Sequence, residues 1–171
     1  MNEIETKRFV LKILEEKYLS NLFKILSNIN VIDTLNMERH TKIEDTINML
    51  NEYYDGFRKN EKFPYEIIDK ESNEFVGVFL IKLDLYDEDS FEFTIYIDEK
   101  FWNKGIYTEI LPYMTEVAFN EIKTGNFRGF VMEKNIASRR VLEKCNFTLE
   151  KIFEVEGIDG KIYSYLKKNP L

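Results

Sequence analysis

The chain has 171 residues, of which 44% are hydrophobic, and a formal net charge of −7 at pH 7. This length and composition predict a single domain, residues 1–171, with a sizeable core, and they exclude a disordered chain. The acidic balance disfavours nucleic acid and anionic membranes as partners. It weakly favours a cationic partner such as an amine, although ordinary solubility explains it equally well.

One cysteine, Cys145, and one histidine, His40, limit the chemistry that side chains can carry. A lone cysteine cannot form an intrachain disulfide, which fits a reducing compartment, and this pair gives no reason to expect a metal. The N-terminus lacks the basic start and apolar core of a signal peptide, and no apolar run approaches the roughly 20 residues of a membrane span. We therefore expect a cytoplasmic protein.

The N-terminal half is predicted to combine strands and helices, from the period of its apolar residues. Residues 8–14 alternate as a strand does, whereas residues 43–57 repeat apolar residues at the spacing of a helix. A turn at residues 71–73 lies between two apolar runs, which indicates a hairpin. The expected elements are strand 8–14, helix 15–27, an irregular connection 28–41, helix 43–57, and strands 64–69, 75–83 and 91–97.

In the C-terminal half, a predicted helix starts directly after Gly105 and contains Pro112. Because proline has no N–H, the Thr108 carbonyl loses its partner, and we expect a kink or a first turn that is not ideal α-helix. Asn146 is expected to adopt the left-handed conformation that ends a helix. The expected elements are helix 106–122, strand 127–132, helix 137–145 and a hairpin of strands 148–155 and 161–166.

The most informative stretch is residues 91–111, where a strand leads into a turn containing Gly105 and then at once into a helix. The first backbone N–H groups of a helix have no intrahelical partner, and the helix dipole adds positive potential there, so this junction is a candidate anion site. A turn of this kind is also a common plain connection. Local pattern alone leaves both interpretations open. Trp102, in the same turn, is expected to anchor it by packing.

Three segments of the chain carry motifs. Residues 102–109 read W-N-K-G-I-Y-T-E, residues 135–147 follow the pattern N-x-x-S-x-x-x-L-E-K-x-x-F, and residues 5–12 read E-T-K-R-F-V-L-K. Together they resemble the GNAT superfamily of acyl-CoA-dependent N-acyltransferases, in particular the RimJ/RimL-type ribosomal-protein N-terminal acetyltransferases. That branch has W-G-K-G-Y-A-T-E where this chain has residues 102–109, and its first strand is similar to residues 5–12. The resemblance runs from about residue 5 to residue 166.

The resemblance implies an α+β fold with three layers, α/β/α. Its sheet would be mixed and mostly antiparallel, with about seven strands and about four helices in the chain. The sheet would splay between the fourth and fifth strands, after residue 97. A monomer or a homodimer is expected.

The implied function is an acetyl-CoA-dependent N-acetyltransferase that moves an acetyl group to a primary amine by direct attack in a ternary complex. The acceptor amine could be a protein N-terminus, or a small amine or antibiotic; its contacts would come from residues 15–63, which carry the fewest motifs. A CoA-binding module with impaired turnover is the alternative, because Asn103, Tyr107 and Pro112 depart from the pattern of the family. A structural domain without a ligand is a third possibility.

In the family, backbone groups hold most of the coenzyme. The end of the strand pairs with the pantetheine amides, and the turn and first helical residues hold the pyrophosphate. Asn135 would bond the pantetheine arm, although capping the next helix is its simpler role. The Tyr107 ring could crowd the phosphates, flank them and donate its hydroxyl, or face the core. The implied coenzyme residues are Ile95, Tyr96, Ile97, Asn103, Lys104, Gly105, Ile106, Tyr107, Thr108, Asn135, Ser138 and Arg139.

Two residues are candidates for proton transfer. Glu92 matches a general base of the family, and a carboxylate on a strand lining an apolar cleft would have a raised pKa; a solvent-facing Glu is the alternative. Ser138 matches the residue proposed to protonate the departing thiolate in RimL-like enzymes. Many other members use a Tyr four residues later, where this chain has Leu142. Cys145 is expected to be buried and His40 to lie at the surface, neither with a catalytic role.

Overall fold

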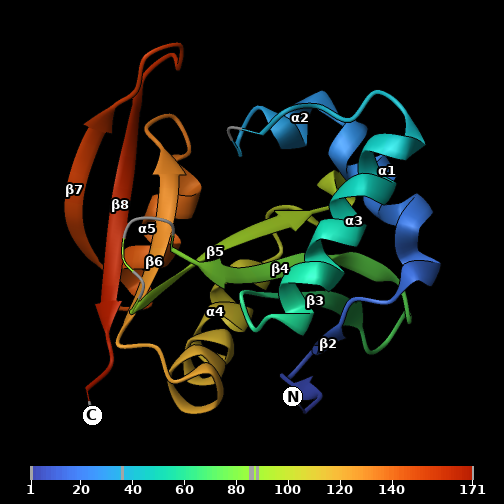
Figure 1. The fold of residues 1–171 in the computed structure, drawn as a ribbon, viewed down its shortest axis with the longest axis horizontal. Helices are drawn as coiled ribbons and strands as arrows, with labels where there is room; N and C mark the ends of the chain where they lie inside the picture. Colours follow the sequence, from blue (N-terminus) through green and yellow to red (C-terminus); the bar gives the residue numbers. More distant parts are fainter. Residues whose placement is uncertain (1, 36, 85–86, 88, 171) are drawn as a thin grey trace.

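The computed structural model describes residues 2–35, 37–84, 87 and 89–170, and these form one eight-stranded sheet with helices on both faces (Figure 1). The strands are β1 (Ile4–Glu5), β2 (Phe9–Ile13), β3 (Lys62–Asp69), β4 (Phe75–Leu83), β5 (Ser90–Ile97), β6 (Asn126–Met132), β7 (Thr148–Glu154) and β8 (Lys161–Lys168). Their order is β1-β2-β3-β4-β5-β6-β8-β7, and each neighbouring pair is antiparallel except β5 and β6, which are parallel.

The helices confirm the expected α+β class. They are α1 (Leu19–Ser27), α2 (Ile29–Ile32), α3 (Ile43–Arg58), α4 (Ile106–Glu116) and α5 (Ile136–Lys144), with 3₁₀ turns at Glu16–Tyr18 and Glu99–Phe101 and a π-helical segment at Val117–Ile122. Within the described residues, none of these helices combines the length and the apolar character that a membrane crossing needs.

Two apolar clusters lie on opposite faces of the sheet and make the three layers. Helices α1, α2 and α3 cover one face, and α4 and α5 cover the other (Figure 1). Side chains alternate along β5, so Phe93 joins the cluster that contains Ile110 of α4, whereas Tyr96 joins the cluster that contains Leu22 and Leu50. The strand β5 therefore presents residues to both helical layers.

The sheet divides between β5 and β6. The two strands pair only from Ser90 opposite Asn126 to Phe93 opposite Gly129, while β6 pairs with β8 along its whole length. The predicted splay between these strands is confirmed, but it begins after Phe93 and not after residue 97. The reason is that β6 follows β8, which carries it away from the end of β5.

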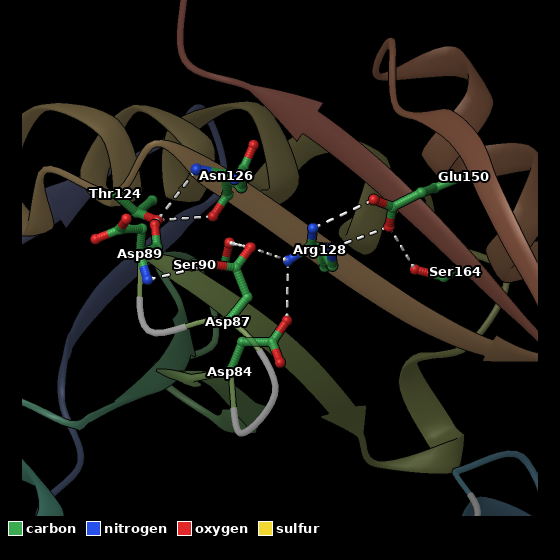
Figure 2. Close-up of polar contacts among 9 residues, drawn as sticks. All are labelled: Asp84, Asp87, Asp89, Ser90, Thr124, Asn126, Arg128, Glu150 and Ser164. Carbon is green, nitrogen blue, oxygen red and sulfur yellow. Dashed lines mark hydrogen bonds and ion pairs between the residues drawn. The ribbon is translucent and has the colours of Figure 1, made fainter.

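At the paired end of these strands, Arg128 of β6 is the centre of an ionic cluster (Figure 2). Its guanidinium lies 3.0 Å from Asp84, 3.1 Å from Asp87 and 2.9 Å from Glu150, and its side chain is only 13% exposed. Glu150 also accepts a hydrogen bond from Ser164 at 3.2 Å. The cluster therefore ties the segment between β4 and β5 to β7 and β8.

Several elements differ from the predictions in small ways. The helix predicted over 15–27 begins with a 3₁₀ turn, and α2 occupies part of the predicted connection 28–41, of which residue 36 lies outside the described residues. Asn28 caps α2 by accepting the N–H of Asn30, a local bond that no apolar period signals. The two-residue strand β1 is the eighth strand beyond the seven expected.

The ends of two helices test predictions about single residues. Asn146, with φ 62°, adopts the left-handed conformation predicted for it after α5. The first turn of α4 is regular, since the Glu109 N–H donates to the Gly105 carbonyl at 3.1 Å, so the expected distortion of that turn is wrong. Pro112 lies further along, and the change to π-helix comes only at Val117.

Candidate active site

The diverging ends of β5 and β6 open a cavity of about 730 Å³ that is lined from both helical layers. This volume lies within the range of small-molecule sites. Tyr53 of α3 lines it on one side of the sheet, and Ile106 and Val141 of α4 and α5 line it on the other. Of the predicted site, the cavity is lined by Glu92, Ile95, Tyr96, Ile97, Asn103, Lys104, Gly105, Ile106, Tyr107, Thr108, Asn135 and Ser138.

The backbone of β5 offers hydrogen-bonding groups to this cavity. The Asp98 N–H donates to Val76 of β4, and Ser90 accepts the N–H of Asp84, so even-numbered residues of β5 bond toward β4. Backbone direction alternates along a strand, so Ile95 and Ile97 direct their N–H and C=O groups to the other side, where β6 has diverged. Tyr96 was predicted as a backbone contact, yet its own backbone groups face β4.

The turn before α4 holds two residues in the left-handed region. Asn103 has φ 60° and Gly105 has φ 69°, and Gly105 is the N-cap of α4 without a side-chain capping bond. Asn tolerates this conformation better than most residues, which explains how the turn forms with Asn at position 103. Ile106, Tyr107 and Thr108 form the first turn of α4, and their N–H groups have no acceptor within the helix.

Trp102 anchors the same turn by packing, as predicted. Its ring lies against the apolar cluster under α1 and α3, and its Nε1–H donates to the Ile97 carbonyl at 3.0 Å. This bond ties the end of β5 to the turn. Of the backbone groups that face the diverging strand, the N–H and C=O of Ile95 and the N–H of Ile97 are the ones best placed for a ligand.

The N-terminal segment is fastened to α4 through Glu109. Its carboxylate accepts the Thr6 hydroxyl at 2.7 Å, the Arg8 backbone N–H at 2.8 Å and the Arg8 Nε–H at 2.6 Å. Burial alone would raise the pKa of Glu109, but these hydrogen bonds outweigh burial and lower it. Two of the three sequence motifs, residues 5–12 and 102–109, are therefore in direct contact at the start of α4.

Glu92 lines the cavity on the α3 side of the sheet, where its carboxylate is only 17% exposed. Lys82 of β4 lies directly opposite in the strand pairing, and its Nζ approaches Glu92 Oε1 to 2.6 Å. The environment predicted for Glu92 was an apolar cleft, and this is wrong because an ammonium occupies one side of the carboxylate. The ion pair leaves Oε2 as the oxygen of Glu92 that does not contact Lys82 at this distance.

A pair of tyrosines is buried in the α3 side of the same cavity wall. The Tyr53 hydroxyl of α3 and the Tyr96 hydroxyl of β5 are hydrogen-bonded to each other, and both rings are almost fully buried. Burial raises the pKa of Tyr53 to about 12 and that of Tyr96 well above its usual value. Both groups are therefore neutral phenols at physiological pH and fix the position of α3 relative to β5.

Asn135 and Ser138 lie on the other wall of the cavity. Asn135 is the N-cap of α5, and Ser138 lies in its first turn. Asn135 Oδ1 accepts the Ser138 N–H at 3.1 Å, which is the N-cap predicted as its simpler role. Leu142, one turn further along, is fully buried in the core. The ring of Tyr107 packs edge-on against Phe93 at 6.4 Å between centroids, so it faces the core and the cavity wall.

Known proteins identify the family. Residues 8–148 match the GNAT acetyltransferase domain. The chain belongs to the GNAT acetyltransferase family. The probable N-acetyltransferase YjcK of Bacillus subtilis (strain 168) is 29% identical over 111 residues, which span 64% of this chain and 61% of that protein.

Solved GNAT structures share the fold of this chain. A RimL ribosomal L7/L12 α-N-protein acetyltransferase in complex with coenzyme A has 19% identity, a TM-score of 0.84 and 98% coverage of both chains. Spermidine N-acetyltransferase from Vibrio cholerae, in complex with CoA and spermine, has 18% identity and a TM-score of 0.80, covering 94% of this chain and 95% of that chain. At these identities the likeness establishes the fold alone.

Arg139 is the predicted coenzyme residue that the structure places elsewhere. Its guanidinium stacks 3.9 Å from the centre of the Tyr163 ring, and its Nε lies 3.4 Å from the Tyr165 hydroxyl. Arg139 is not among the described residues that line the cavity. A role in holding coenzyme phosphates stays a prediction for this GNAT chain.

Sequence reasoning missed the residues that come from outside the GNAT motifs. Lys62 and Lys82 line the cavity on the α3 side of the sheet, together with Glu52 and Tyr53 of α3. Lys62 Nζ lies 3.7 Å from Glu52, so this side holds two Lys–Glu pairs. The pairing of Lys82 with Glu92 follows from the hairpin register of β4 and β5, which is the one signal that could have revealed it.

The two remaining residues that were singled out have no place in this cavity among the described residues. Cys145 is buried in the core, as predicted, and burial raises the pKa of its thiol. His40 is only partly exposed, and its Nδ1 lies 2.8 Å from the hydroxyl of the buried Thr46, so the prediction of a surface residue is wrong in part. Its contact with α3 is the reason.

Proposed function

We propose that this GNAT member transfers the acetyl group of acetyl-CoA to a primary amine by direct attack, with both substrates bound in the cavity between β5 and β6. The observation that carries the proposal is the position of this cavity. It is lined by Glu92 on the α3 side of the sheet and by Ser138 on the α5 side. A thioester held in the gap would therefore have a candidate base on one side and a candidate acid on the other.

The coenzyme side fits a phosphate ester with an extended amide arm. The first N–H groups of α4, together with the left-handed turn at Asn103 and Gly105, form a cluster of backbone donors suited to a pyrophosphate. The backbone of Ile95 faces the gap left by β6 and would pair with the pantetheine amides as an added strand would. Acetyl-CoA supplies the activated thioester.

The attacking amine must lose a proton, and Glu92 is the residue proposed to receive it. Lys82 holds Oε1, which fixes the orientation of the carboxylate and leaves Oε2 to take the proton directly or through water. The ammonium of Lys82 also disfavours a second positive charge nearby, which promotes the neutral form of the acceptor. On the opposite wall, the Ser138 hydroxyl would donate its proton to the departing sulfur.

The acceptor side favours a protein N-terminal amine over a polyamine. Val31, Leu35, Met37 and Met49 give it an apolar wall, which suits the side chains of a peptide. Among the described residues that line it, the two carboxylates, on Glu52 and Glu92, are each paired with a lysine, so these residues leave no surplus of negative charge to attract a polycation. A small amine that carries an apolar group is the second candidate, because the same wall would hold it.

Two measurements test the proposal in sequence. Acetyl-CoA at about 100 times its dissociation constant should stabilise the protein by roughly 2.7 kcal/mol, seen as a higher melting temperature. CoA release is then followed with peptides that carry a free N-terminal amine, the same peptides with a blocked N-terminus, and spermine. We expect turnover with free peptides alone.

The possible outcomes separate the competing functions. Absence of any melting shift with acetyl-CoA would contradict the proposal and favour a structural domain. A shift without CoA release from any amine would favour a binding module. Release with spermine but not with peptides would keep the acetyltransferase and refute the acceptor class.

A further inference from the structure

A row of three charged residues crosses the sheet on the cavity wall that faces α3. Lys62 of β3 is paired directly with Lys82 of β4, and Lys82 is paired directly with Glu92 of β5. All three line the cavity, and α3 packs on β3 at one end of the row (Figure 1). Like charges placed directly opposite each other destabilise a sheet, so the two adjacent lysines point to a role beyond the stability of the fold.

The two lysines differ in how firmly they are paired. Lys82 Nζ lies 2.6 Å from Glu92, whose side chain is only 17% exposed. Lys62 Nζ lies 3.7 Å from Glu52 of α3, whose side chain is 70% exposed. An ion pair at this separation with such an exposed partner is weak, because water solvates the carboxylate equally well. An incoming anion could therefore replace Glu52 at Lys62 and leave the ion pair of Glu92 intact.

The side chain of Lys62 is held in place although its ion pair is loose. Its stem packs against Gly56 of α3, where a Cβ would lie 2.6 Å from Lys62 Cγ. Its ammonium lies 5.7 Å from the centre of the Tyr53 ring. A side chain that is already restricted loses less conformational freedom when a ligand binds. Lys62 is therefore a pre-positioned cation in the cavity wall.

We infer that Lys62 binds a carboxylate of the acceptor, carried by the side chain of the second residue of an acceptor peptide. The inference rests on the proposed function, which places the acceptor amine at Glu92. Neighbouring strands lie about 4.8 Å apart, so the Cα atoms of Lys62 and Glu92, two strands apart, are separated by about 10 Å.

This separation selects among the possible sources of the carboxylate. The α-carboxylate of a free amino acid is only two bonds from the amine nitrogen, so it cannot extend to Lys62 while the amine is at Glu92. An acidic side chain on the second residue begins about 3.5 Å further along an extended peptide and adds its own length. A basic second residue is disfavoured, because it would meet the ammonium groups of Lys62 and Lys82.

The test compares peptides that differ only in the second residue, Ala-Glu, Ala-Gln and Ala-Lys, with free glutamate as a further acceptor. CoA release gives kcat and KM for each. The wild type should have a kcat/KM about tenfold higher for the Ala-Glu peptide than for the Ala-Gln peptide, the effect of one hydrogen bond to a charged group. The difference should lie in KM, because the carboxylate is remote from the bond that reacts. The Ala-Lys peptide and free glutamate should be the poorest acceptors.

Lys62→Met removes the ammonium and retains the packing of the stem on Gly56. It should lower kcat/KM for the Ala-Glu peptide about tenfold, to the level of the Ala-Gln peptide. Lys62→Arg should restore the preference, since it keeps the positive charge. Lys59→Met is the matched control, because Lys59 is exposed at the end of α3 and is not among the described residues that line the cavity. Its preference should equal that of the wild type.

The outcomes separate this inference from the function on which it rests. Equal kcat/KM for the Ala-Glu and Ala-Gln peptides, or a preference that survives Lys62→Met, would overturn the inference and leave the acetyltransferase intact. Better turnover of free glutamate than of the Ala-Glu peptide would show that the site takes an α-carboxylate, and would overturn the assignment to the second residue. Absence of CoA release from every free amine would refute the proposed function, and this inference with it.

Discussion

The two ends of the β5–β6 pair differ in structure: the strands are hydrogen-bonded at one end and separated by a cavity at the other. At the end where the strands are paired, from Ser90 to Phe93, Arg128 joins the segment before β5 to the C-terminal strands through three carboxylates (Figure 2). At the end where they diverge, the backbone of Ile95 faces a cavity. One end satisfies its polar groups within the protein, and the other presents backbone groups to the cavity.

The transition between the two ends is abrupt because the packing there is tight. A Cβ on Gly129, the last residue of β6 that pairs with β5, would lie 2.9 Å from the Phe93 ring and 3.2 Å from Leu142. Glycine at this position lets α5 and β5 close on β6 just before the strands separate. We therefore expect changes at the paired end to alter stability, and changes at the open end to alter binding or rate.

The largest effect is expected from Glu92→Gln, at the open end. Loss of a general base typically costs about 10²–10⁴-fold in rate. The loss should shrink as pH rises, because more of the acceptor amine is then already deprotonated, and affinity for acetyl-CoA should hardly change. CoA release from pH 6 to 9.5 measures this. Glu116→Gln, on the exposed face of α4, is the control. Wild-type turnover of Glu92→Gln at neutral pH, with chemistry rate-limiting, would rule out this base.

At the paired end, Arg128→Met should destabilise the fold by about 3 kcal/mol, because it leaves Asp84, which is 3% exposed, and two further carboxylates without their cation. The free energy of unfolding in urea is the measurement. Arg58→Met removes a surface ion pair with Asp55 and should cost less than about 1 kcal/mol. Equal costs for the two variants would show that the cluster of Arg128 behaves as a surface feature.

Gly105→Pro tests the backbone donors of the open end. Proline cannot adopt a φ of 69° and has no N–H, so acetyl-CoA should bind about 100-fold more weakly or worse. Gly157 has φ 83° in the β7–β8 turn, and Gly157→Pro imposes a similar strain far from the cavity. Isothermal titration should find unchanged affinity for that control. Similar affinities of the two variants would refute the placement of the coenzyme.

How far the sequence predicted this architecture depends on the length of each element. Long periodic segments such as α3, β4 and β5 were predicted within a residue or two, since burial of one face imposes a regular period. The four-residue α2 has no room for a period and depends on one capping bond from Asn28. The divergence point after Phe93 depends on the pairing of β6 with β8, which local pattern does not contain.

The site residues that belong to one continuous segment could be predicted from the sequence. Those that reach the cavity from other helices and strands could not. The turn before α4 is a local structure, so Asn103 and Gly105 could be placed from sequence. Lys82 and Tyr53 reach the cavity from β4 and α3, and their contacts depend on strand register and helix packing. The polar environment of Glu92 was therefore missed, although its place on the cavity wall was predicted.

The smallest expected effect is a change in the pH dependence of stability at the paired end. Hydrogen bonds from Ser90 and Arg128 lower the pKa of Asp87, and the hydrogen bond and charge of Arg128 lower that of Glu150. A lowered folded-state pKa gives stability that is present above the unfolded value, about 4, and is lost as pH falls through the folded value.

Removing the cation reverses this dependence. In Arg128→Met the neighbouring carboxylates repel one another, so their protonation stabilises the folded variant. In the wild type the same protonation removes ion pairs with Arg128 and destabilises the fold. The difference in free energy of unfolding between them should therefore narrow as pH falls from 7 to about 3, where the carboxylates of both proteins approach neutrality. Urea titrations at several pH values measure it, with Arg58→Met expected to follow the wild type closely. A difference that stays constant or widens would show that Arg128 stabilises this end by packing and not by charge.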